Sequence, residues 1–528
     1  MTSPESTSPP PPPPPPPGTA VPKAPAPTTV AGGKRGRRAE KPEPGVKTPW
    51  RDNLEAGVMA ILLALFLKAF LVEAYKIPSG SMQPTLMGMP SPGDMQVRRA
   101  GEKPLEVKDR ILVDKLSYKL RDPKRWEVAV FRYPLKRTQN FVKRLVGLPG
   151  DRLRIQNGDL WTYDDELNQW SVLRRPAGVQ AAQWRELDMD SDDLRLWNQV
   201  SGSGWLLDGR DVTVRGDGAV QYGDGSSIVD RYFDGYPASI RSKLPARHPA
   251  KERLHPVGDL RLTGSVRAFE STESITLVLT EGQRRYAFVL PGPAAPADQV
   301  VAIEIDPPSS AVDADRVEVA GLRLERGKRV RFEIENLDDR LTLRMGGEVV
   351  AQLDVTEAFD QSARVIIQAR GDEAELRDLR LDRDIYYFAE HQREYEIPEG
   401  CYFAMGDNTL DSSDSREWTR ARFEITGGDD SEPVVLEGNL RDRENPSRSW
   451  RDPALGEVVR FTDQWGTHHL LQINPGLQPE LPEWLTPVDD LGAERSPYIE
   501  RELIVGRALA VFWPLAPHKG IYRLSWVH

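Results

Sequence analysis

The stretch YKIPSGSMQPTL, Tyr75 to Leu86, comes directly after a long apolar segment and sets two serines and a glycine between two prolines. Gly, Ser and Pro are common loop residues, so a plain linker is one interpretation of this stretch. A serine held on such a loop can also serve as a nucleophile. Which interpretation applies to Ser81 depends on the segments that precede and follow the loop.

The apolar segment before the loop runs from Leu54 to Ala74, and Lys68 is the one charge well inside it. As a helix it would be about 31 Å long, which matches the hydrocarbon thickness of a bilayer. A cleavable signal peptide has a shorter apolar core and a shorter preceding tail, and a buried helix of a soluble domain is seldom apolar on every face. The segment therefore predicts one uncleaved transmembrane helix over residues 54–74.

The N-terminal tail, residues 1–53, contains a proline run from Pro9 to Pro17 and the basic cluster GKRGRR. It has too few apolar residues to offset the entropy of ordering, so we expect it to be disordered. Basic residues gather just before the apolar segment, whereas only Lys76 follows it closely; they are Lys34, Arg35, Arg37, Arg38, Lys41, Lys47 and Arg51. By the positive-inside rule the N-terminus should be cytoplasmic and the bulk of the chain extracytoplasmic.

The composition limits the classes of function. The 528 residues predict several domains, and the net charge of −10 argues against a nucleic-acid partner, which would need a concentrated basic face. Cys401 is the only cysteine, so an internal disulfide and a cysteine-based zinc site are excluded. The histidines are scattered, and the adjacent His468 and His469 would point to opposite sides of a strand. We expect neither a metal nor a cofactor.

Beyond the loop the chain is mainly β. Short apolar runs such as RILVDK, WEVAVF and FVKRLV are each ended by Pro, Gly or Asp. Residues 203–384 contain many alternating runs, among them RLTGSVRAF and RVRFEIEN, which predict an inserted antiparallel β-sandwich. A strand and turn, CYFAMGDN, follow from Cys401, and residues 419–498 look like a second insertion before ELIVGRALAVFW.

Four motifs occur in one order along the chain: IPSGSMQPTL, FVKRLVGLPGD, MGDNTLDSSDSR and VGRA. They resemble the boxes of bacterial type I signal peptidases, membrane-anchored enzymes that remove signal peptides from exported proteins. Each motif is too short to be specific alone, but their shared order is specific. The resemblance covers residues near 54–160, 395–418 and 499–515.

The resemblance implies a signal-peptidase-type β catalytic domain on one N-terminal transmembrane helix. Its parts would be residues 75–202 with a connecting segment, 385–418 and 499–528. The sandwich over residues 203–384 resembles concanavalin-like, laminin-G-type domains in its strand pattern and in LTLRMGGEVVAQLDV. We expect this insertion to fold as a unit, so that a short Gly-Ser linker in its place would leave cleavage within a few-fold.

The chemistry also follows from the residues themselves. A serine hydroxyl becomes a nucleophile when a base takes its proton, and a neutral lysine can be that base. The strand period puts Lys143 on one face with Phe141 and Leu145, an apolar setting that favours the neutral amine, and puts Arg144 on the other. An isolated strand lysine would more often reach toward solvent. The accompanying motifs favour the base.

By the match to the first two motifs, Ser81 is the nucleophile and Lys143 the general base. Ser79 would complete, with the backbone N–H of Ser81, an oxyanion hole for the scissile carbonyl oxygen. Gly80 between them lacks a Cβ, so a substrate backbone can approach closely. Met82 would pack beside the nucleophile.

The third motif implies supporting roles. Ser412 would orient Lys143, Asp414 and Arg416 would form an ion pair, and Gly406 would shape the site in a turn with Asp407 and Asn408. Read alone, this motif has the composition of an Asx-rich surface loop. The chain has Thr409 and Leu410 where the family often has an Arg-Asp pair, which leaves the packing of this loop open.

The resemblance implies a membrane-bound serine endopeptidase that cleaves signal peptides from exported preproteins after small residues. Its partners would be preproteins and membrane lipid, and its place the bacterial cytoplasmic membrane, crossed once. The alternative is a membrane-tethered binding protein that acts through residues 203–384 on a glycan or protein ligand, with an inert peptidase portion. Self-cleaving repressors share a Ser-Lys dyad, but the apolar span and the lack of a basic DNA-binding region disfavour them.

Overall fold

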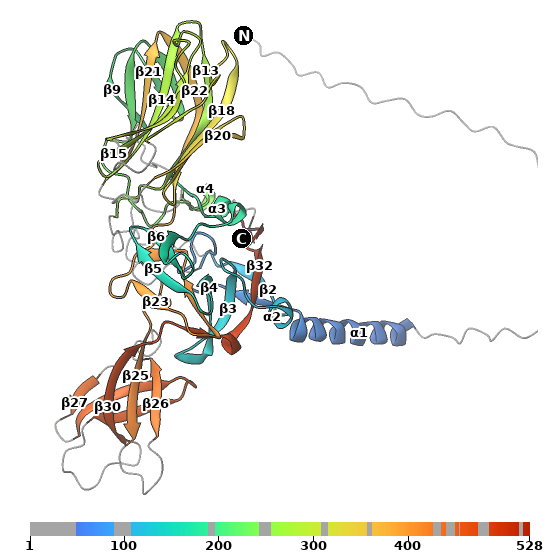
Figure 1. The fold of residues 1–528 in the computed structure, drawn as a ribbon. Helices are drawn as coiled ribbons and strands as arrows, with labels where there is room; N and C mark the ends of the chain where they lie inside the picture. The colour runs from blue at the N-terminus through green and yellow to red at the C-terminus, as the bar shows by residue number, and fades with distance from the viewer. Residues whose placement is uncertain are drawn as a thin grey trace, which may run out of the picture. The chain divides into compact units, whose positions relative to one another are not determined.

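The structure is a computed structural model, and it describes residues 49–88, 107–187, 196–241, 255–307, 315–355, 362–425, 434–439, 449–452, 455–473, 485–516 and 521–528. The chain divides into two compact units, residues 1–62 and 63–528 (Figure 1). The disorder expected for residues 1–53 falls almost wholly outside the described residues, since only residues 49–53 are described, and they begin the helix α1.

The helix α1 spans Pro49–Phe70. The chain then leaves the helix, and Val72–Lys76 form strand β1, which pairs with β2, Arg110–Asp114. The transmembrane helix predicted for residues 54–74 is therefore wrong at its C-terminal boundary, because backbone pairing with β2 takes over from Val72. Within the described part of the chain, no helix reaches the length and apolarity needed to cross a membrane.

One antiparallel sheet joins segments from both ends of the chain, in the order β1-β2-β32-β3-β4-β24-β31, with β35 paired to β32. Its further strands are β3 (Val128–Tyr133), β4 (Lys136–Gly147), β24 (Cys401–Met405), β31 (Ile499–Glu500), β32 (Ile504–Trp513) and β35 (Ser525–Trp526). The short helices α2 (Ser117–Leu120) and η3 (Arg501–Leu503) lie between these strands in the chain. All four sequence motifs lie on this sheet or directly beside its strands.

A smaller antiparallel sheet has the order β23-β5-β6-β7. Its strands are β5 (Arg152–Gln156), β6 (Asp159–Asp164), β7 (Gln169–Val172) and β23 (Glu394–Glu396). Apolar side chains of both sheets share one core, which includes Val146, Leu153, Tyr395 and Phe403. This shared core joins residues before the sandwich to residues after it.

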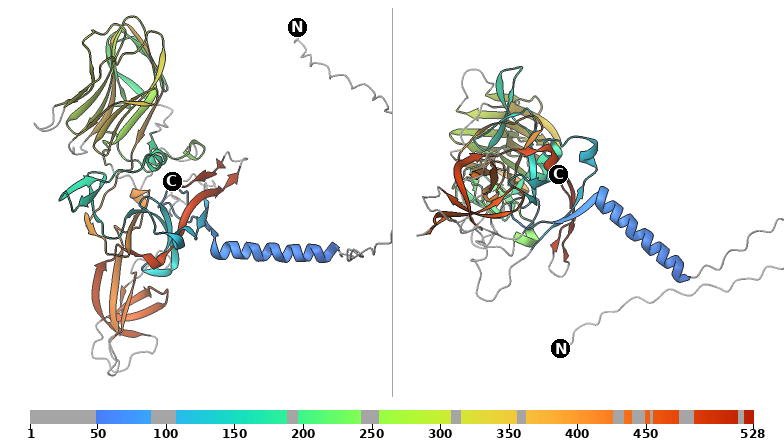
Figure 2. Two further views of the ribbon diagram at one scale, coloured as in Figure 1. Left: turned by 45° about the vertical axis from the view of Figure 1, so that its right-hand side comes forward. Right: turned by 90° about the horizontal axis from the view of Figure 1, so that it is seen from below.

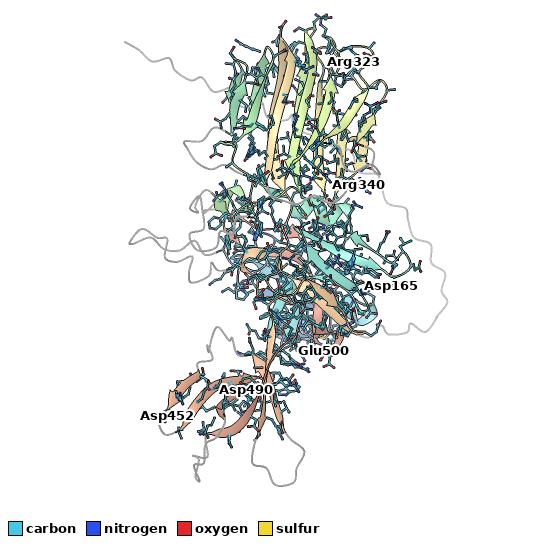
Figure 3. The ribbon with its side chains drawn as sticks, turned by 60° about the vertical axis from the view of Figure 1, so that its left-hand side comes forward. Asp165, Arg323, Arg340, Asp452, Asp490 and Glu500 are labelled. Atoms are coloured by element: carbon cyan, nitrogen blue, oxygen red, sulfur yellow. The ribbon has the colours of Figure 1, made fainter. Side chains whose placement is uncertain are left out.

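The predicted mainly-β fold with an antiparallel sandwich is confirmed. Its two sheets have the orders β10-β11-β22-β13-β18-β19-β20, with β8 paired to β22, and β17-β16-β15-β14-β21-β12-β9 (Figure 1; further views in Figure 2). One large apolar core lies among their side chains, with Leu277, Phe288, Ile334 and Ile367 fully buried. Arg323 and Arg340 mark opposite ends of the sandwich in Figure 3.

The strands of the first sheet are β8 (Arg185–Glu186), β10 (Leu206–Asp208), β11 (Asp211–Arg215), β13 (Leu260–Ala268), β18 (Arg329–Leu337), β19 (Arg340–Met345), β20 (Glu348–Asp354) and β22 (Glu373–Arg383). Those of the second are β9 (Trp197–Ser201), β12 (Gly218–Tyr222), β14 (Thr272–Glu281), β15 (Arg284–Pro291), β16 (Val301–Asp306), β17 (Arg316–Glu318) and β21 (Ala363–Gly371). The start predicted at residue 203 is too late, because β9 already pairs with β12.

The segment expected as a second insertion forms a sheet with the order β26-β25-β30-β29-β28-β27. Its strands are β25 (Thr419–Ile425), β26 (Val435–Asn439), β27 (Ser449–Asp452), β28 (Gly456–Asp463), β29 (His468–Ile473) and β30 (Thr486–Arg495). Phe423, Phe461 and Val488 lie in its own apolar core, and Asp490 on β30 is exposed (Figure 3). A two-stranded ribbon of β33 (Leu515–Ala516) and β34 (Ile521–Tyr522) follows β32.

Candidate active site

The loop that carries Ser81 runs from Ile77 to Gly88 and is closed at both ends by Asp109. The N–H of Ile77 donates to the carbonyl oxygen of Asp109 at 2.9 Å, and the N–H of Asp109 donates to that of Met87 at 2.8 Å. The buried Asp109 carboxylate also accepts from the Met87 N–H at 2.8 Å and pairs with Arg523 at 2.7 Å. The loop is thus a fixed part of the sheet.

Close packing holds the serines of this loop. The hydroxyl oxygens of Ser79 and Ser81 are 3.4 Å apart. A Cβ on Gly88 would stand 1.9 Å from the carbonyl oxygen of Ser79, so only glycine fits where the loop closes. Met82, expected beside the nucleophile, is 1 % exposed and packs with Leu86 into the apolar core of the sheet.

Lys143 lies on β4 and is 3 % exposed. Across the strands Lys143 faces Ala129 on β3, and on the other side Arg144 faces Met405 at the end of β24. This pairing ends one residue short of Lys143 on β4 and of Gly406, which follows β24. Lys143 Nζ lies 5.7 Å from the centre of the Phe141 ring, on the face that the strand period predicts.

Gly406 is where the loop of Ser81 meets the third motif. A Cβ on Gly406 would stand 2.2 Å from Ser412 Oγ and 2.3 Å from the carbonyl oxygen of Ser81. Asn408 binds the same loop, because its N–H donates to the Ser81 carbonyl oxygen at 3.1 Å and its Nδ2 donates to that of Gly80 at 3.0 Å. The structure therefore brings the loop of Ser81, Ser412 and Gly406 to one place.

Asp414 and Arg416 form a two-pronged ion pair behind this turn. Arg416 Nε donates to Asp414 Oδ1 and Nη2 to Oδ2, both at 2.8 Å, and both side chains are buried. Asp414 Oδ2 also accepts the N–H of Gly406 at 2.9 Å. Burial alone would raise the pKa of the Asp414 carboxyl, but the Arg416 guanidinium and, more weakly, Lys143 hold it below its usual range.

Sequence reasoning missed a second buried ion pair, between Arg144 and Asp407. Arg144 Nη2 lies 2.7 Å from Asp407 Oδ2 and Nε donates to Oδ1 at 2.8 Å, with each side chain 1 % exposed. Although burial would raise the pKa of Asp407, the Arg144 guanidinium lowers it to about 2. The signal was present, because Arg144 shares its strand face with Val142 and Val146, and a charge in apolar surroundings needs a partner.

The Asp407 pair is also tied to the loop of Ser81. Thr85 Oγ1 donates to Asp407 Oδ2 at 2.6 Å. Arg144 donates in addition to the backbone oxygens of Trp126 and His528, both at 2.7 Å, so His528 lies against the same group. Asp407 thus joins three separate segments around the candidate site.

The chain departs from the family pattern at Thr409 and Leu410, and the structure shows what this part of the loop packs against. Both residues lie in the short helix η2 (Thr409–Asp411). Leu410 packs against a cluster that contains Met87, Tyr232 and Phe233. The tyrosine and phenylalanine come from the chain between β12 and β13, within the insertion.

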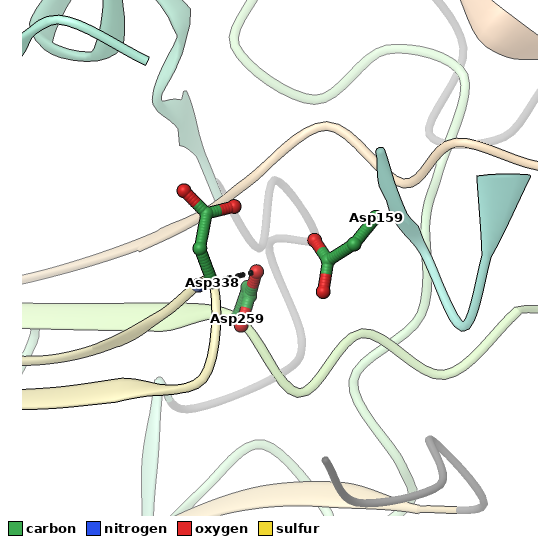
Figure 4. Close-up of side chains that lie close together, drawn as sticks. All are labelled: Asp159, Asp259 and Asp338. Atoms are coloured by element: carbon green, nitrogen blue, oxygen red, sulfur yellow. Dashed lines mark hydrogen bonds between the residues drawn. The ribbon is translucent and has the colours of Figure 1, made fainter. Parts of the chain in front are cut away.

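Three carboxylates converge elsewhere, from Asp159 at the start of β6 and from Asp259 and Asp338 beside the sandwich strands (Figure 4). One oxygen of each lies within 4.8 Å of the others. The N–H of Asp338 donates to Asp259 Oδ2 at 3.2 Å, and burial raises the pKa of Asp338 to about 6. Carboxylates suit hard cations, but the positive charges of Arg174 and Arg175 offset part of the negative charge of these aspartates. The sequence analysis identified none of the three aspartates as a candidate ligand.

Comparison with known proteins tests the family resemblance that the motifs indicate. The family model "Signal peptidase, peptidase S26" matches residues 50–203 and 342–428. The predicted resemblance to type I signal peptidases is confirmed. Residues 204–341, between the two matched parts, lie within the region of the sandwich strands, and residues 429–528, which carry the fourth motif, lie outside the match.

Curated relatives agree with the family match. The chain is 31% identical over 144 residues to the probable signal peptidase I-2 of Synechocystis sp., which covers 26% of this chain and 57% of the relative. It is 41% identical over 106 residues to signal peptidase I of Pseudomonas aeruginosa, which covers 18% of this chain and 31% of that protein. The chain thus covers less than two thirds of either relative.

Solved structures resemble the chain only distantly. A carbohydrate binding module, CBM66 from Bacillus subtilis, covers 36% of this chain and 97% of its own at 11% identity and a TM-score of 0.23. The galectin LEC-6 of Caenorhabditis elegans covers 24% and 90%, at 10% identity and a TM-score of 0.17. Similarities at TM-scores this low do not establish a shared fold.

Proposed function

We propose that this protein is a serine endopeptidase that removes N-terminal signal peptides from exported preproteins, cleaving after small residues. The observation that carries the proposal is the packing around Gly406. The Ser81 carbonyl oxygen and Ser412 Oγ approach this glycine from two loops, and Lys143 on β4 acts electrostatically on Asp414, which accepts the Gly406 N–H. This arrangement of residues far apart in the sequence supports a Ser/Lys dyad.

In the proposed reaction Ser81 Oγ attacks the carbonyl carbon of the scissile bond while Lys143 Nζ takes the hydroxyl proton. The oxyanion that forms accepts hydrogen bonds from the Ser81 N–H and the Ser79 hydroxyl, whose oxygen is 3.4 Å from Ser81 Oγ. Lys143 then gives the proton to the leaving amine. A water molecule, deprotonated by Lys143, releases the signal peptide from Ser81.

Ser412 would orient the general base. Its Oγ is buried and makes no hydrogen bond to the described residues, and a buried hydroxyl without a partner is costly. It stands next to Gly406, whose N–H binds Asp414, and Lys143 acts electrostatically on the same carboxylate, so the lysine side chain is a suitable partner. Asp414 would hold the Gly406 N–H and keep negative charge near the protonated lysine.

We further propose that the protein works at the bacterial cytoplasmic membrane, with the N-terminus on the cytoplasmic side. In support, large apolar side chains of α1 are exposed along the helix, including Leu54, Val58, Met59, Ile61 and Leu62. Exposed apolar residues in such number mark a surface that contacts lipid or another apolar partner.

The alternative, a tethered binding protein with an inert peptidase portion, is not favoured, because the candidate site retains Ser81, Lys143 and both buried ion pairs. A glycan or protein ligand of the sandwich stays a prediction.

The test is cleavage of a labelled preprotein by the purified full-length protein in detergent. We expect cleavage by the wild-type protein, none by Ser81→Ala, and normal rates for Ser227→Ala, a serine of the insertion outside the site. A preprotein with large residues before the cleavage point should resist. Cleavage that persists in Ser81→Ala would overturn the proposed mechanism.

A further inference from the structure

A segment of the sandwich insertion reaches the loop of Ser81. It runs from Asp230 to Arg241, between β12 and β13, and ends in the short helix α4 (Ala238–Arg241). Its side chains form a buried cluster with residues of the catalytic part; from the segment these are Tyr232, Phe233, Tyr236 and Ile240, and from the catalytic part Met87, Val107 and Leu410. We call residues 230–241 the aromatic strut.

The strut makes a buried hydrogen bond to the loop. The Tyr236 hydroxyl donates to Gln83 Oε1, and Gln83 Nε2 donates across the loop to the carbonyl oxygen of Gly88 at 3.3 Å. Gln83 is 5 % exposed and follows Ser81 by two residues. Its N–H donates to the carbonyl oxygen of Gly80 at 3.0 Å, so its backbone closes the turn on which Ser81 sits.

The Gln83 amide also packs closely against Gly80. A Cβ on Gly80 would stand 3.0 Å from Gln83 Oε1 and 3.2 Å from the Tyr232 hydroxyl oxygen. Tyr232 in turn donates to Asp411 Oδ2 at 3.1 Å, on the loop that carries Ser412. The two tyrosines thus contact both loops that meet at Gly406.

The strut is anchored to the sandwich. Arg383, the last residue of β22, pairs with Asp234 at 2.6 Å, and both side chains are less than a tenth exposed. Arg383 Nη2 donates to the carbonyl oxygen of Arg231 at 3.0 Å. A fixed connection therefore leads from the end of a sandwich strand through the strut to Gln83.

The geometry points to Tyr236 as a positioning residue for the nucleophile, acting through the Gln83 amide, so that the inserted sandwich is a working part of the active site. This inference rests on the proposed peptidase function. It differs from the expectation that residues 203–384 are dispensable, since a Gly-Ser linker in their place would remove the strut. Catalytic groups need positions accurate to a fraction of an ångström, and a loop that loses a buried anchor loses that accuracy.

The test compares Tyr236→Phe with Tyr286→Phe in the full-length protein. Both remove one buried tyrosine hydroxyl, but Tyr286 donates to Glu281 at 2.7 Å within the sandwich core. We expect Tyr236→Phe to lower kcat about tenfold with KM within about twofold, because the change misplaces Ser81 without removing a substrate contact. Tyr286→Phe should keep the wild-type kcat.

A double variant shows whether Tyr236 acts through Gln83. Gln83→Leu should lower kcat to a similar extent, and Tyr236→Phe combined with it should cause no further loss. Losses that multiply, or a wild-type kcat in Tyr236→Phe, would overturn the inference while the Ser81→Ala control still supports the peptidase function.

Hydrogen exchange gives a readout that needs no activity. In Tyr236→Phe we expect faster amide exchange in residues 77–88, and in Tyr286→Phe no change there. If the wild-type protein cleaves no preprotein, the proposed function fails, and unchanged exchange at residues 77–88 in Tyr236→Phe would separately refute the anchoring by the strut.

Discussion

Ser412 packs directly on Gly406, so closely that a Cβ on the glycine would stand 2.2 Å from Ser412 Oγ. The same Cβ would stand 2.3 Å from the carbonyl oxygen of Ser81. Rotation of the Ser412 hydroxyl would not relieve the overlap, because Ser412 Cβ would stand 2.7 Å away and the Ser81 oxygen belongs to the backbone. The contact between the two loops therefore depends on the absence of a side chain at position 406.

Gly406→Ala should lower kcat/KM at least about 100-fold, because the added methyl group forces the Ser81 and Ser412 loops apart. Cleavage of a labelled preprotein measures the effect. The matched control is Gly178→Ala on α3 (Ala177–Gln183), where a Cβ would meet nothing within 4 Å. Near-wild-type cleavage by Gly406→Ala would show that the loop contact is not needed for catalysis.

Lys143→Arg should abolish cleavage. Arginine keeps the positive charge but stays protonated at any working pH, so it cannot accept the proton of Ser81. Lys115→Arg is the control, since this lysine is in a partly exposed pair with Glu73 at 3.3 Å and should tolerate the change. Rapid turnover by Lys143→Arg would assign the lysine a purely structural charge.

Asp407→Asn should lower the free energy of unfolding at pH 7 by about 3–5 kcal/mol, because it leaves the Arg144 charge buried without its partner. Denaturant unfolding followed by tryptophan fluorescence measures the change. Glu394→Gln, which breaks the partly exposed pair with Arg154, should have little effect. Equal losses in the two variants would contradict a special role for the buried pair.

The ion pair of Arg144 and Asp407 also predicts that the free energy of unfolding depends on pH. The pKa of Asp407 is about 2 in the folded protein, below the value of about 4 for an unfolded aspartate, so the ionised pair stabilises the fold above about pH 4. This contribution is lost as the pH falls from about 4 toward 2. We expect the stability gap between wild type and Asp407→Asn to narrow over that interval; a constant gap would argue against the low pKa.

Membrane attachment can be tested on α1. Met59 and Leu62 are 66% and 55% exposed, and glutamate at both positions should release the full-length protein from membranes in an alkaline wash. Leu167→Glu, at a leucine 65% exposed between β6 and β7, should leave the protein in the membrane fraction. Retention of the double variant would assign attachment to another part of the chain.

Local pattern was enough to identify the motif residues and the β class of the fold. The order of the four motifs indicated Ser81, Lys143 and Ser412 as candidate site residues. The strand period placed Lys143 with Phe141, a contact that the structure contains. Alternating apolar runs predicted the sandwich, because a strand buried on one face must repeat every second residue. Such signals lie within a few residues of each other and need no knowledge of distant partners.

Tertiary structure alone decided which distant segments meet. The partner of Arg144 is Asp407, the buried contact of Gln83 is Tyr236, and the helix over residues 54–74 ends early because Val72 pairs with Asp114. Each of these outcomes depends on a contact between residues separated by tens to hundreds of positions, which leaves no periodic trace in the sequence. Buried polar groups must find partners wherever the fold brings one within reach, so the sequence determined which groups need a partner and the packing determined which partner each one has.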